Sequence, residues 1–218
     1  LTTTVSAFAL TVNVSTINTD WTGSFDIYKY DITNAEKDGV WDSSYVSTGV
    51  RDPGVEDILG SDTRKSSLNA NGEVNGYAIK GVEFTYLKVA DIRTYTEDDN
   101  GASHVEVLYG ITQNDANNTF LSAIGVSAGD RYVPADSEDG AMYFYRSDTL
   151  INGLKSALAS NAITVKNALE RFVRENGGTA MPLTDSYGHT SASDLPLGLY
   201  LIVETKVPEM VTETTAPF

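Results

Sequence analysis

Apolar and polar residues alternate along several stretches of the chain, and this pattern predicts β-strands. Residues 23–31 alternate throughout, and residues 199–204 are apolar on both faces except at the last position. Two further stretches are strand-like: residues 77–90, and residues 104–111, which follow the turn signal Asp98-Asp-Asn-Gly101. The pattern therefore favours a mainly β protein.

The alternation in residues 23–31 predicts which way each side chain points. Phe25, Ile27 and Lys29 fall on one face of an extended strand, whereas Asp26, Tyr28 and Tyr30 fall on the other. Lys29 is therefore expected to point in the same direction as two core residues.

A carboxylate stands at the end of the apolar run at residues 199–204. Leu199, Leu201 and Val203 share one face, and Tyr200, Ile202 and Glu204 share the other, so both faces of this strand are expected to be covered. Burying a carboxylate is costly unless it is hydrogen-bonded or protonated. Glu204 therefore needs a partner.

Residues 148–176 follow a helical period instead. Apolar residues recur at helical spacing before and after a break near Asn161, which predicts two short amphipathic helices. Ser147 or Asp148 and Thr164 are the expected N-caps, and Asn176-Gly-Gly178 is the expected stop. We interpret this pair as an insertion of about residues 148–176 between strands.

The remaining segments carry weaker patterns. Residues 33–76 are rich in Asp, Ser, Asn and Gly, and we expect short strands and long loops there. Residues 1–15 are an N-terminal segment with two interpretations, a signal-peptide remnant cleaved near Ala7-Phe-Ala9 or an alternating edge strand. The domain itself is expected to span residues 16–218.

Composition narrows the function classes. The chain has 218 residues and a net charge of −15, so nucleic acid and anionic membrane surfaces are not expected partners. It has no cysteine, which excludes disulfides and cysteine-based metal or catalytic sites. No stretch approaches the roughly 18 apolar residues of a membrane span.

Four blocks of sequence carry a resemblance to a known family. Tyr200-x-x-x-Glu204-x-x-x-Pro208 resembles the E-box of sortase-assembled pilins of Gram-positive bacteria, and Thr16–Asp31 resembles the start of a mature backbone pilin. Gly81–Val89 is similar to the family's second core strand, and Thr179–Thr190 is similar to the hairpin that precedes the E-box. The blocks occur in the order that the family has.

The resemblance implies a fold and a function. The fold would be an immunoglobulin-like β-sandwich of the collagen-adhesin B type (Cna B-type), with long loops and the helical pair inserted. The chain would be the N-terminal domain of a major pilin, a structural subunit of a covalently polymerised pilus on a Gram-positive cell wall, outside the cell. Its partners would be neighbouring pilin subunits, joined by sortase, with a host surface ligand as a further candidate. No cofactor and no metal are expected.

In this family a strand lysine attacks an asparagine side-chain amide and releases ammonia while a buried acid assists. The amine must be neutral to act as a nucleophile and the acid must hold a proton, and burial in a dry core favours both forms. By resemblance, Lys29 occupies the position of the nucleophile and Glu204 that of the acid.

The third participant in this chemistry is missing from the expected place. The family's asparagine usually follows the E-box, but residues 205–218 contain neither Asn nor Gln. Either the asparagine lies downstream of Phe218, or this domain carries the motif without the bond. We expect no such bond within this chain. The family's polymerisation motif, Tyr-Pro-Lys-Asn, is also absent from the sequence.

Three other functions are compatible with parts of the sequence. Gly125-Val-Ser-Ala-Gly129 fits the nucleophile elbow of serine hydrolases, with Ser127 as the nucleophile and His104 or His189 as the base, and a strand would precede it at Phe120–Ile124. A pilus-tip adhesin could bind a glycan or a host protein through Trp21, Trp41 and the tyrosines. The acidic clusters at residues 97–100 and 136–139 leave a weak calcium site open, although neither has EF-hand spacing.

Overall fold

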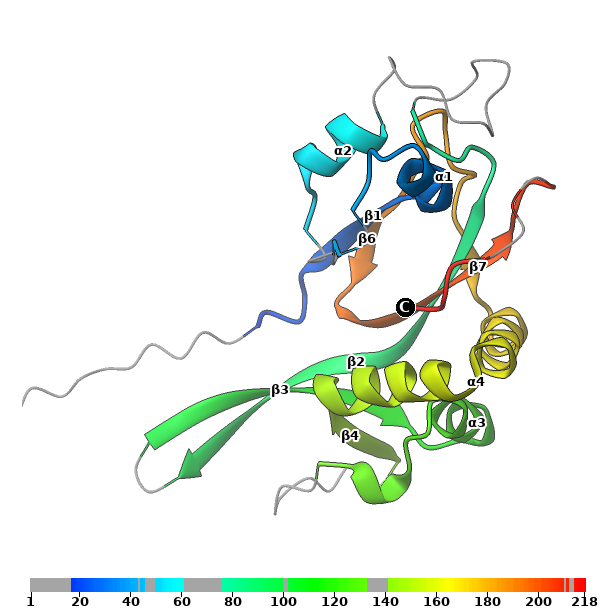
Figure 1. The fold of residues 1–218 in the computed structure, drawn as a ribbon. Helices are drawn as coiled ribbons and strands as arrows, with labels where there is room; N and C mark the ends of the chain where they lie inside the picture. The colour runs from blue at the N-terminus through cyan, green and yellow to red at the C-terminus, as the bar shows by residue number, and fades with distance from the viewer. Residues whose placement is uncertain are drawn as a thin grey trace, which may run out of the picture.

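The computed structural model describes residues 17–42, 44–45, 50–60, 76–99, 102–132, 141–209, 211 and 214–218 (Figure 1). These described residues form a mixed, β-rich fold with antiparallel sheets and four α-helices, and no barrel. The strands are β1 (Thr22–Tyr28), β2 (Glu83–Asp99), β3 (Ala102–Thr112), β4 (Met142–Arg146), β5 (Thr179–Ala180), β6 (His189–Pro196) and β7 (Gly198–Lys206). The helices are α1 (Ile32–Lys37), α2 (Pro53–Leu59), α3 (Asp115–Ala123) and α4 (Ser147–Glu175), with a 3₁₀ turn, η1, at Ala128–Asp130.

Strand β2 organises the larger sheet. Its first half pairs with β7 and, at Thr85 and Tyr86, with β5, whereas its second half pairs with β3, which in turn pairs with β4. Asp91 has a Cα partner on each side, Gly110 of β3 and Gly198 of β7, so β3 and β7 lie on opposite edges of β2. Strands β1 and β6 form a separate two-stranded sheet.

Helices α3 and α4 provide the larger of the hydrophobic cores. Leu169 and Val173 of α4 have no exposed surface and belong to one buried cluster with Ile111 and Tyr145 of the sheet. The rings of Phe120 and Phe172 stack between the two helices, with centroids 5.2 Å apart. The predicted amphipathic pattern of residues 148–176 thus buries its apolar stripe against β3, β4 and β7. Figure 1 shows α4 lying beside α3 and the sheet.

The predicted break in the helical segment and the predicted stop after it, at Asn176, are confirmed, but the predicted N-caps are not. Asn161 has non-helical angles, φ −157° and ψ 78°, and divides α4 into two helices. Its own side chain accepts a hydrogen bond from the Thr164 backbone N–H, so Asn161 performs the capping that Thr164 was predicted to perform. At the start of α4 the cap position is Arg146, which makes no side-chain cap bond.

A smaller core lies between the two-stranded sheet and the first half of β2. Ile27 of β1 belongs to one buried cluster with Phe84 of β2 and Ile202 of β7. Phe25 packs against the same cluster, whereas the Asp26 carboxylate contacts His189 at 2.7 Å. The alternation predicted for residues 23–31 is therefore confirmed along β1.

The expectation of loops at residues 33–76 is confirmed at residues 38–42, 44–45 and 50–52, but the rest of the expectation is wrong where two helices form. Helices α1 and α2 form there, each capped by an aspartate, Asp31 and Asp52, whose side chain accepts backbone N–H groups of the first turn. Each helix buries a single residue, Ala35 or Leu59. One buried residue leaves no apolar period in the sequence, so periodicity could not find these helices. Residues 1–15 lie outside the described residues.

We predict that Gly188→Ala destabilises the domain more than Gly177→Ala does. Both glycines have a positive φ, +72° and +80°, so both substitutions cost about 1–2 kcal/mol from backbone strain. A Cβ at Gly188 would also overlap the Lys29 carbonyl oxygen, whereas one at Gly177 would meet nothing within 4 Å. Urea unfolding of both variants measures the difference. Equal losses would contradict this close approach.

Candidate functional site

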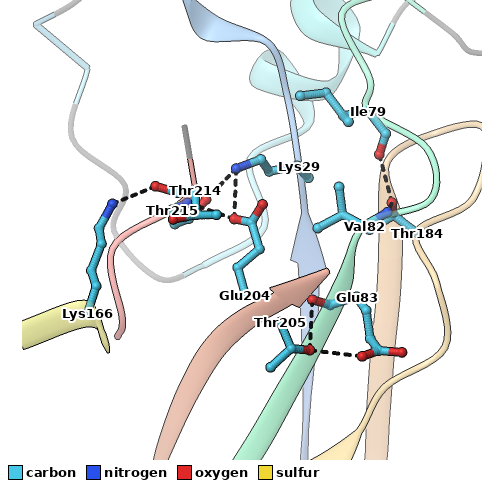
Figure 2. Close-up of polar contacts among 10 residues, drawn as sticks. All are labelled: Lys29, Ile79, Val82, Glu83, Lys166, Thr184, Glu204, Thr205, Thr214 and Thr215. Carbon is cyan, nitrogen blue, oxygen red and sulfur yellow. Dashed lines mark hydrogen bonds and ion pairs between the residues drawn. The ribbon is translucent and has the colours of Figure 1, made fainter. Parts of the chain in front are cut away.

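The backbone of Lys29 is held on both sides immediately after β1. Its N–H donates to the Gly188 carbonyl at 2.8 Å, and its carbonyl accepts from the Ile79 N–H at 2.9 Å. The Ile79 segment is itself fixed by the buried Thr184 hydroxyl, which donates to the Ile79 carbonyl and accepts from the Val82 N–H (Figure 2). These contacts set the direction in which the Lys29 side chain leaves the strand.

The Lys29 ammonium meets the Glu204 carboxylate inside the protein. Lys29 Nζ lies 2.9 Å from Glu204 Oε2, across 175 residues of sequence. The Glu204 side chain has no exposed surface and that of Lys29 is 13% exposed. The structure thus brings together the two residues that the sequence selected, as Figure 2 shows.

Thr215 is the third member of this cluster, which we name the Lys29 node: Lys29, Glu204 and Thr215. The Thr215 N–H donates to Glu204 Oε2 at 2.7 Å, and Lys29 Nζ donates to Thr215 Oγ1 at 2.5 Å. Sequence reasoning missed Thr215 because it searched residues 205–218 only for an amide. The signal that could have found it is the strand-forming Thr214-Thr215 pair shortly after the E-box.

The segment that carries Thr215 lies against β7. Ile202 and Phe218 exchange both backbone hydrogen bonds, at 2.8 and 3.2 Å, which is the antiparallel hydrogen-bonded pattern. Lys166 of α4 donates to the Thr214 carbonyl at 2.6 Å, and the Phe218 ring contacts that of Phe84. Residues 214–218 therefore occupy the edge of β7 that faces away from β2.

The two oxygens of Glu204 have unequal surroundings. Oε2 accepts from both Lys29 and Thr215, whereas Oε1 is buried and has no hydrogen-bond partner among the residues that the structure describes. A buried acceptor without a donor carries a desolvation cost, of about 1–3 kcal/mol in mutational data. The Lys29 node therefore contains one buried acceptor, Glu204 Oε1, whose hydrogen-bonding capacity is not used by any described residue.

The chemistry available at the node follows from what Lys29 Nζ contacts. Among the described residues its two side-chain partners are a carboxylate and a hydroxyl, and neither is a carboxamide that could release ammonia. The side chain at position 215 nevertheless stands directly at the amine. The node therefore brings together a buried acid, an amine and a threonine hydroxyl.

The hydrolase alternative loses its local structural support. The strand expected at Phe120–Ile124 is wrong, because α3 spans Asp115–Ala123. The Ser127 hydroxyl donates to Asp130 Oδ2 at 2.7 Å and caps η1, and these hydrogen bonds hold the pKa of Asp130 below its ordinary value. His189 lies on β6, where its ring contacts Asp26 and Tyr28. The side chain of His104 lies outside the described residues.

The structure describes only some of the residues on which the metal-binding and adhesin alternatives depend. The side chains of residues 97–100, and residues 136–139 altogether, lie outside the described residues, so those acidic clusters stay untested. Elsewhere in the described part, no group of three or more metal-binding side chains gathers. Trp41 packs against a small core with Tyr77, whereas Trp21 is 67% exposed.

Comparison of the chain with protein-family models, with curated proteins and with solved structures finds no match. No helix in the described ranges is both long and apolar enough to cross a membrane. A function for the chain must therefore be inferred from the node and from the motifs around it.

We predict that Glu204→Gln lowers the free energy of unfolding by about 3–5 kcal/mol, because it leaves a buried ammonium without its counter-ion. The double variant Lys29→Met/Glu204→Leu should lose less than this, since neither charge remains buried. Glu170→Gln is the control, because its partner Arg174 is exposed and such a pair contributes about 0–1 kcal/mol.

Urea unfolding of the unaltered chain and of these variants measures each change in the free energy of unfolding. If Glu204→Gln and Glu170→Gln had equal, small effects, the Lys29–Glu204 pair would be no more than a surface ion pair. Circular dichroism of each variant before unfolding checks that all of them reach the folded state.

Proposed function

We propose that this chain is a structural domain of a covalently polymerised pilus shaft on a Gram-positive cell wall. The observation that carries the proposal is the Lys29 node, which joins the end of β1, the E-box strand β7 and the segment at residues 214–218. Neighbouring subunits, linked by sortase, are its proposed partners. It needs no cofactor for this role.

The proposed architecture is an immunoglobulin-like sandwich of the collagen-adhesin B type. Its support is the packing of two antiparallel sheets, β1–β6 against the half of β2 that pairs with β7, around Ile27, Phe84 and Ile202. In this interpretation β3, β4, α3 and α4 are additions between the second core strand and the hairpin that leads to the E-box.

A shaft subunit must resist extension, and the node is suited to that task. Pulling the C-terminal segment away from β7 would break the Ile202–Phe218 hydrogen bonds and, with them, the Thr215 contacts to Lys29 and Glu204. The buried carboxylate would lose one of its two hydrogen-bond donors and Lys29 would lose an acceptor, so these contacts resist separation together. The chain has no cysteine, so disulfides cannot supply this resistance.

The pilus proposal is tested on the bacterial surface. Antibodies raised against this chain should label filaments along their length in immuno-electron microscopy. Cell-wall digests boiled in detergent should show a ladder of high-mass species that disappears when the sortase gene is deleted. A single band of subunit size would contradict a covalent shaft, and labelling confined to filament tips would favour the adhesin alternative.

A substitution at position 215 can test whether the Lys29 node supports isopeptide chemistry. Asn Cγ and Thr Oγ1 are both γ-atoms, so Thr215→Asn places an amide carbon at about hydrogen-bond distance from Lys29 Nζ. A proton shift from Nζ to Glu204 Oε2 would leave a neutral amine. The amine then attacks Cγ and the Nζ–Cγ bond forms. As the Cγ–Nδ2 bond breaks, Nδ2 takes the proton held by Glu204 and leaves as ammonia, and the proton that Nζ loses returns to Glu204.

We predict that the Thr215→Asn variant loses about 17 Da, the mass of one ammonia, and that the unaltered chain keeps its sequence mass. Intact-mass spectrometry measures both, and peptide mapping locates the crosslink. The controls Thr215→Asn/Lys29→Met and Thr215→Asn/Glu204→Ala should keep their full mass. A folded Thr215→Asn variant with no mass loss would contradict the assignment of the node to isopeptide chemistry.

A further inference from the structure

Two asparagine–glycine steps in the α4 region differ in their surroundings. Asn152-Gly153 lies inside the first of the two helices, and Asn176-Gly177 follows the last turn of the second. In such a step the backbone nitrogen of the glycine can attack the carbonyl carbon of the asparagine side chain, because glycine has no side chain to hinder the approach. This slow, spontaneous chemistry is one reason why asparagine is less frequent in proteins that work at high temperature.

The first step, Asn152-Gly153, is held rigidly. Gly153 is helical and packs against the end of α3, where an added Cβ would lie 2.7 Å from the Ile124 carbonyl oxygen and 2.6 Å from the Val126 side chain. In a helix each side chain is tilted toward the N-terminus, and therefore away from the backbone nitrogen of the next residue. Asn152 could react only if its backbone rotated, which would unfold part of a packed helix.

The second step, Asn176-Gly177, lies where α4 ends. Asn176 is the exposed C-cap, with φ −110° and ψ 24°, and Gly177 has a φ of +80° with nothing within 4 Å of an added Cβ. Within the described part of the chain, the Gly177 N–H donates no backbone hydrogen bond. One side-chain bond, from Asn176 Nδ2 to the Phe172 carbonyl at 2.8 Å, holds the asparagine side chain. Breaking this contact frees the side chain to rotate toward the Gly177 nitrogen.

We propose that Asn176 is a site of spontaneous deamidation in the folded protein. The Gly177 backbone nitrogen attacks Asn176 Cγ, the N–Cγ bond forms and the Cγ–Nδ2 bond breaks. Nδ2 takes up the proton that the Gly177 nitrogen loses and leaves as ammonia, and the product is a five-membered succinimide ring. One water then opens the ring at either carbonyl carbon, which gives aspartate or isoaspartate. Asn176 lines a cavity of about 330 Å³ between α3 and α4, so water has room beside it.

Either product weakens the end of α4. An aspartate at position 176 replaces the amide donor with a carboxylate, which repels the Phe172 carbonyl and lies at the negative end of the helix dipole. An isoaspartate lengthens the main chain by one carbon and disturbs the bond from the Gly178 N–H to the Val173 carbonyl, 2.9 Å long, that closes the helix. Phe172 and Val173 belong to the larger core, so the change affects the packing of α4 against α3.

The succinimide and an isopeptide bond at the Lys29 node have the same mass signature, a loss of about 17 Da as ammonia. Trypsin, which cleaves after Lys and Arg, separates the two. The succinimide stays within peptide 175–206, whose only amide side chain is Asn176, whereas a bond at the node joins peptide 207–218 to the peptide that contains Lys29. The deamidation proposal does not depend on the pilus assignment.

Peptide mapping compares the two steps within one chain. The folded protein is incubated in mildly alkaline buffer and digested with trypsin, and Asn152 is the only amide side chain in its own peptide, 147–155. Peptide 175–206 should gain about 1 Da at least about tenfold faster than peptide 147–155, a ratio that corresponds to about 1.4 kcal/mol between the two opening free energies. In urea that unfolds the chain the two peptides should react at similar rates, because both contain Asn-Gly.

The variant Asn176→Asp tests the effect on α4. It should lower the urea midpoint of unfolding more than the matched control Asn152→Asp, which places the same charge away from the C-terminal end of the helix. A peptide 175–206 that keeps its mass in the folded protein but reacts in urea would overturn the proposal, as would equal rates for the two peptides in the folded protein. Equal midpoints for the two variants would overturn the inferred weakening of α4.

Discussion

The burial of the Glu204 carboxylate is the constraint on which the arrangement of the smaller core depends. A carboxylate without exposed surface must be compensated locally, and its compensation comes from Lys29, at the far end of the sequence, and from the Thr215 N–H. Neither partner is local in the chain. Packing the acid therefore requires β1, β7 and the segment at residues 214–218 to be in place together, which couples three strands to a single electrostatic requirement.

Strand β2 holds β7, and with it Glu204, in place. It is the neighbour of β7 in its first half and of β3 in its second, so one continuous backbone connects the core around Phe84 with the core beneath α3 and α4. Both cores place apolar side chains against β7 as well: Ile202 belongs to one, and Leu201 and Val203 belong to the other. This explains why the run at residues 199–204 is apolar on both faces, the feature that made Glu204 conspicuous in the sequence.

The sequence predicted the elements that bury an apolar stripe and missed those that do not. The strands near residues 23–31, 104–111 and 199–204 and the interrupted helix at 148–176 carry a clear period, and each is present. Helices α1, α2 and α3 are short and begin at Asp or Asn caps within polar segments, so their positions are decided by caps and by one or two buried residues each. Periodicity also cannot reveal that β2 changes partners at Asp91, because register is set between strands far apart in the sequence.

The residues of the candidate site also divide into those that the sequence pattern could predict and those that it could not. Lys29 and Glu204 could be selected because each is a charged residue at a position that the strand pattern places in the core. Thr215 could not be selected in this way, because a threonine in a strand is unremarkable until its neighbours are known. Its hydroxyl and N–H contribute polar contacts to a buried charge pair, and that is sufficient reason for its position whether or not any bond ever forms there.

The extent of β7 connects the node with the opposite half of the molecule. At the start of β7, a Cβ on Gly198 would overlap the Lys88 side chain and lie 2.5 Å from the Ala90 carbonyl oxygen, so the chain can approach β2 there only as glycine. Just before Gly198 the chain belongs to β6, which pairs with β1 instead. The crossing from one sheet to the other therefore takes place at Gly198, opposite Asp91. The transfer that carries the chain into β7 therefore also sets the point at which β7 stops pairing with β2, and among the described residues nothing pairs with that edge of β2 beyond Asp91.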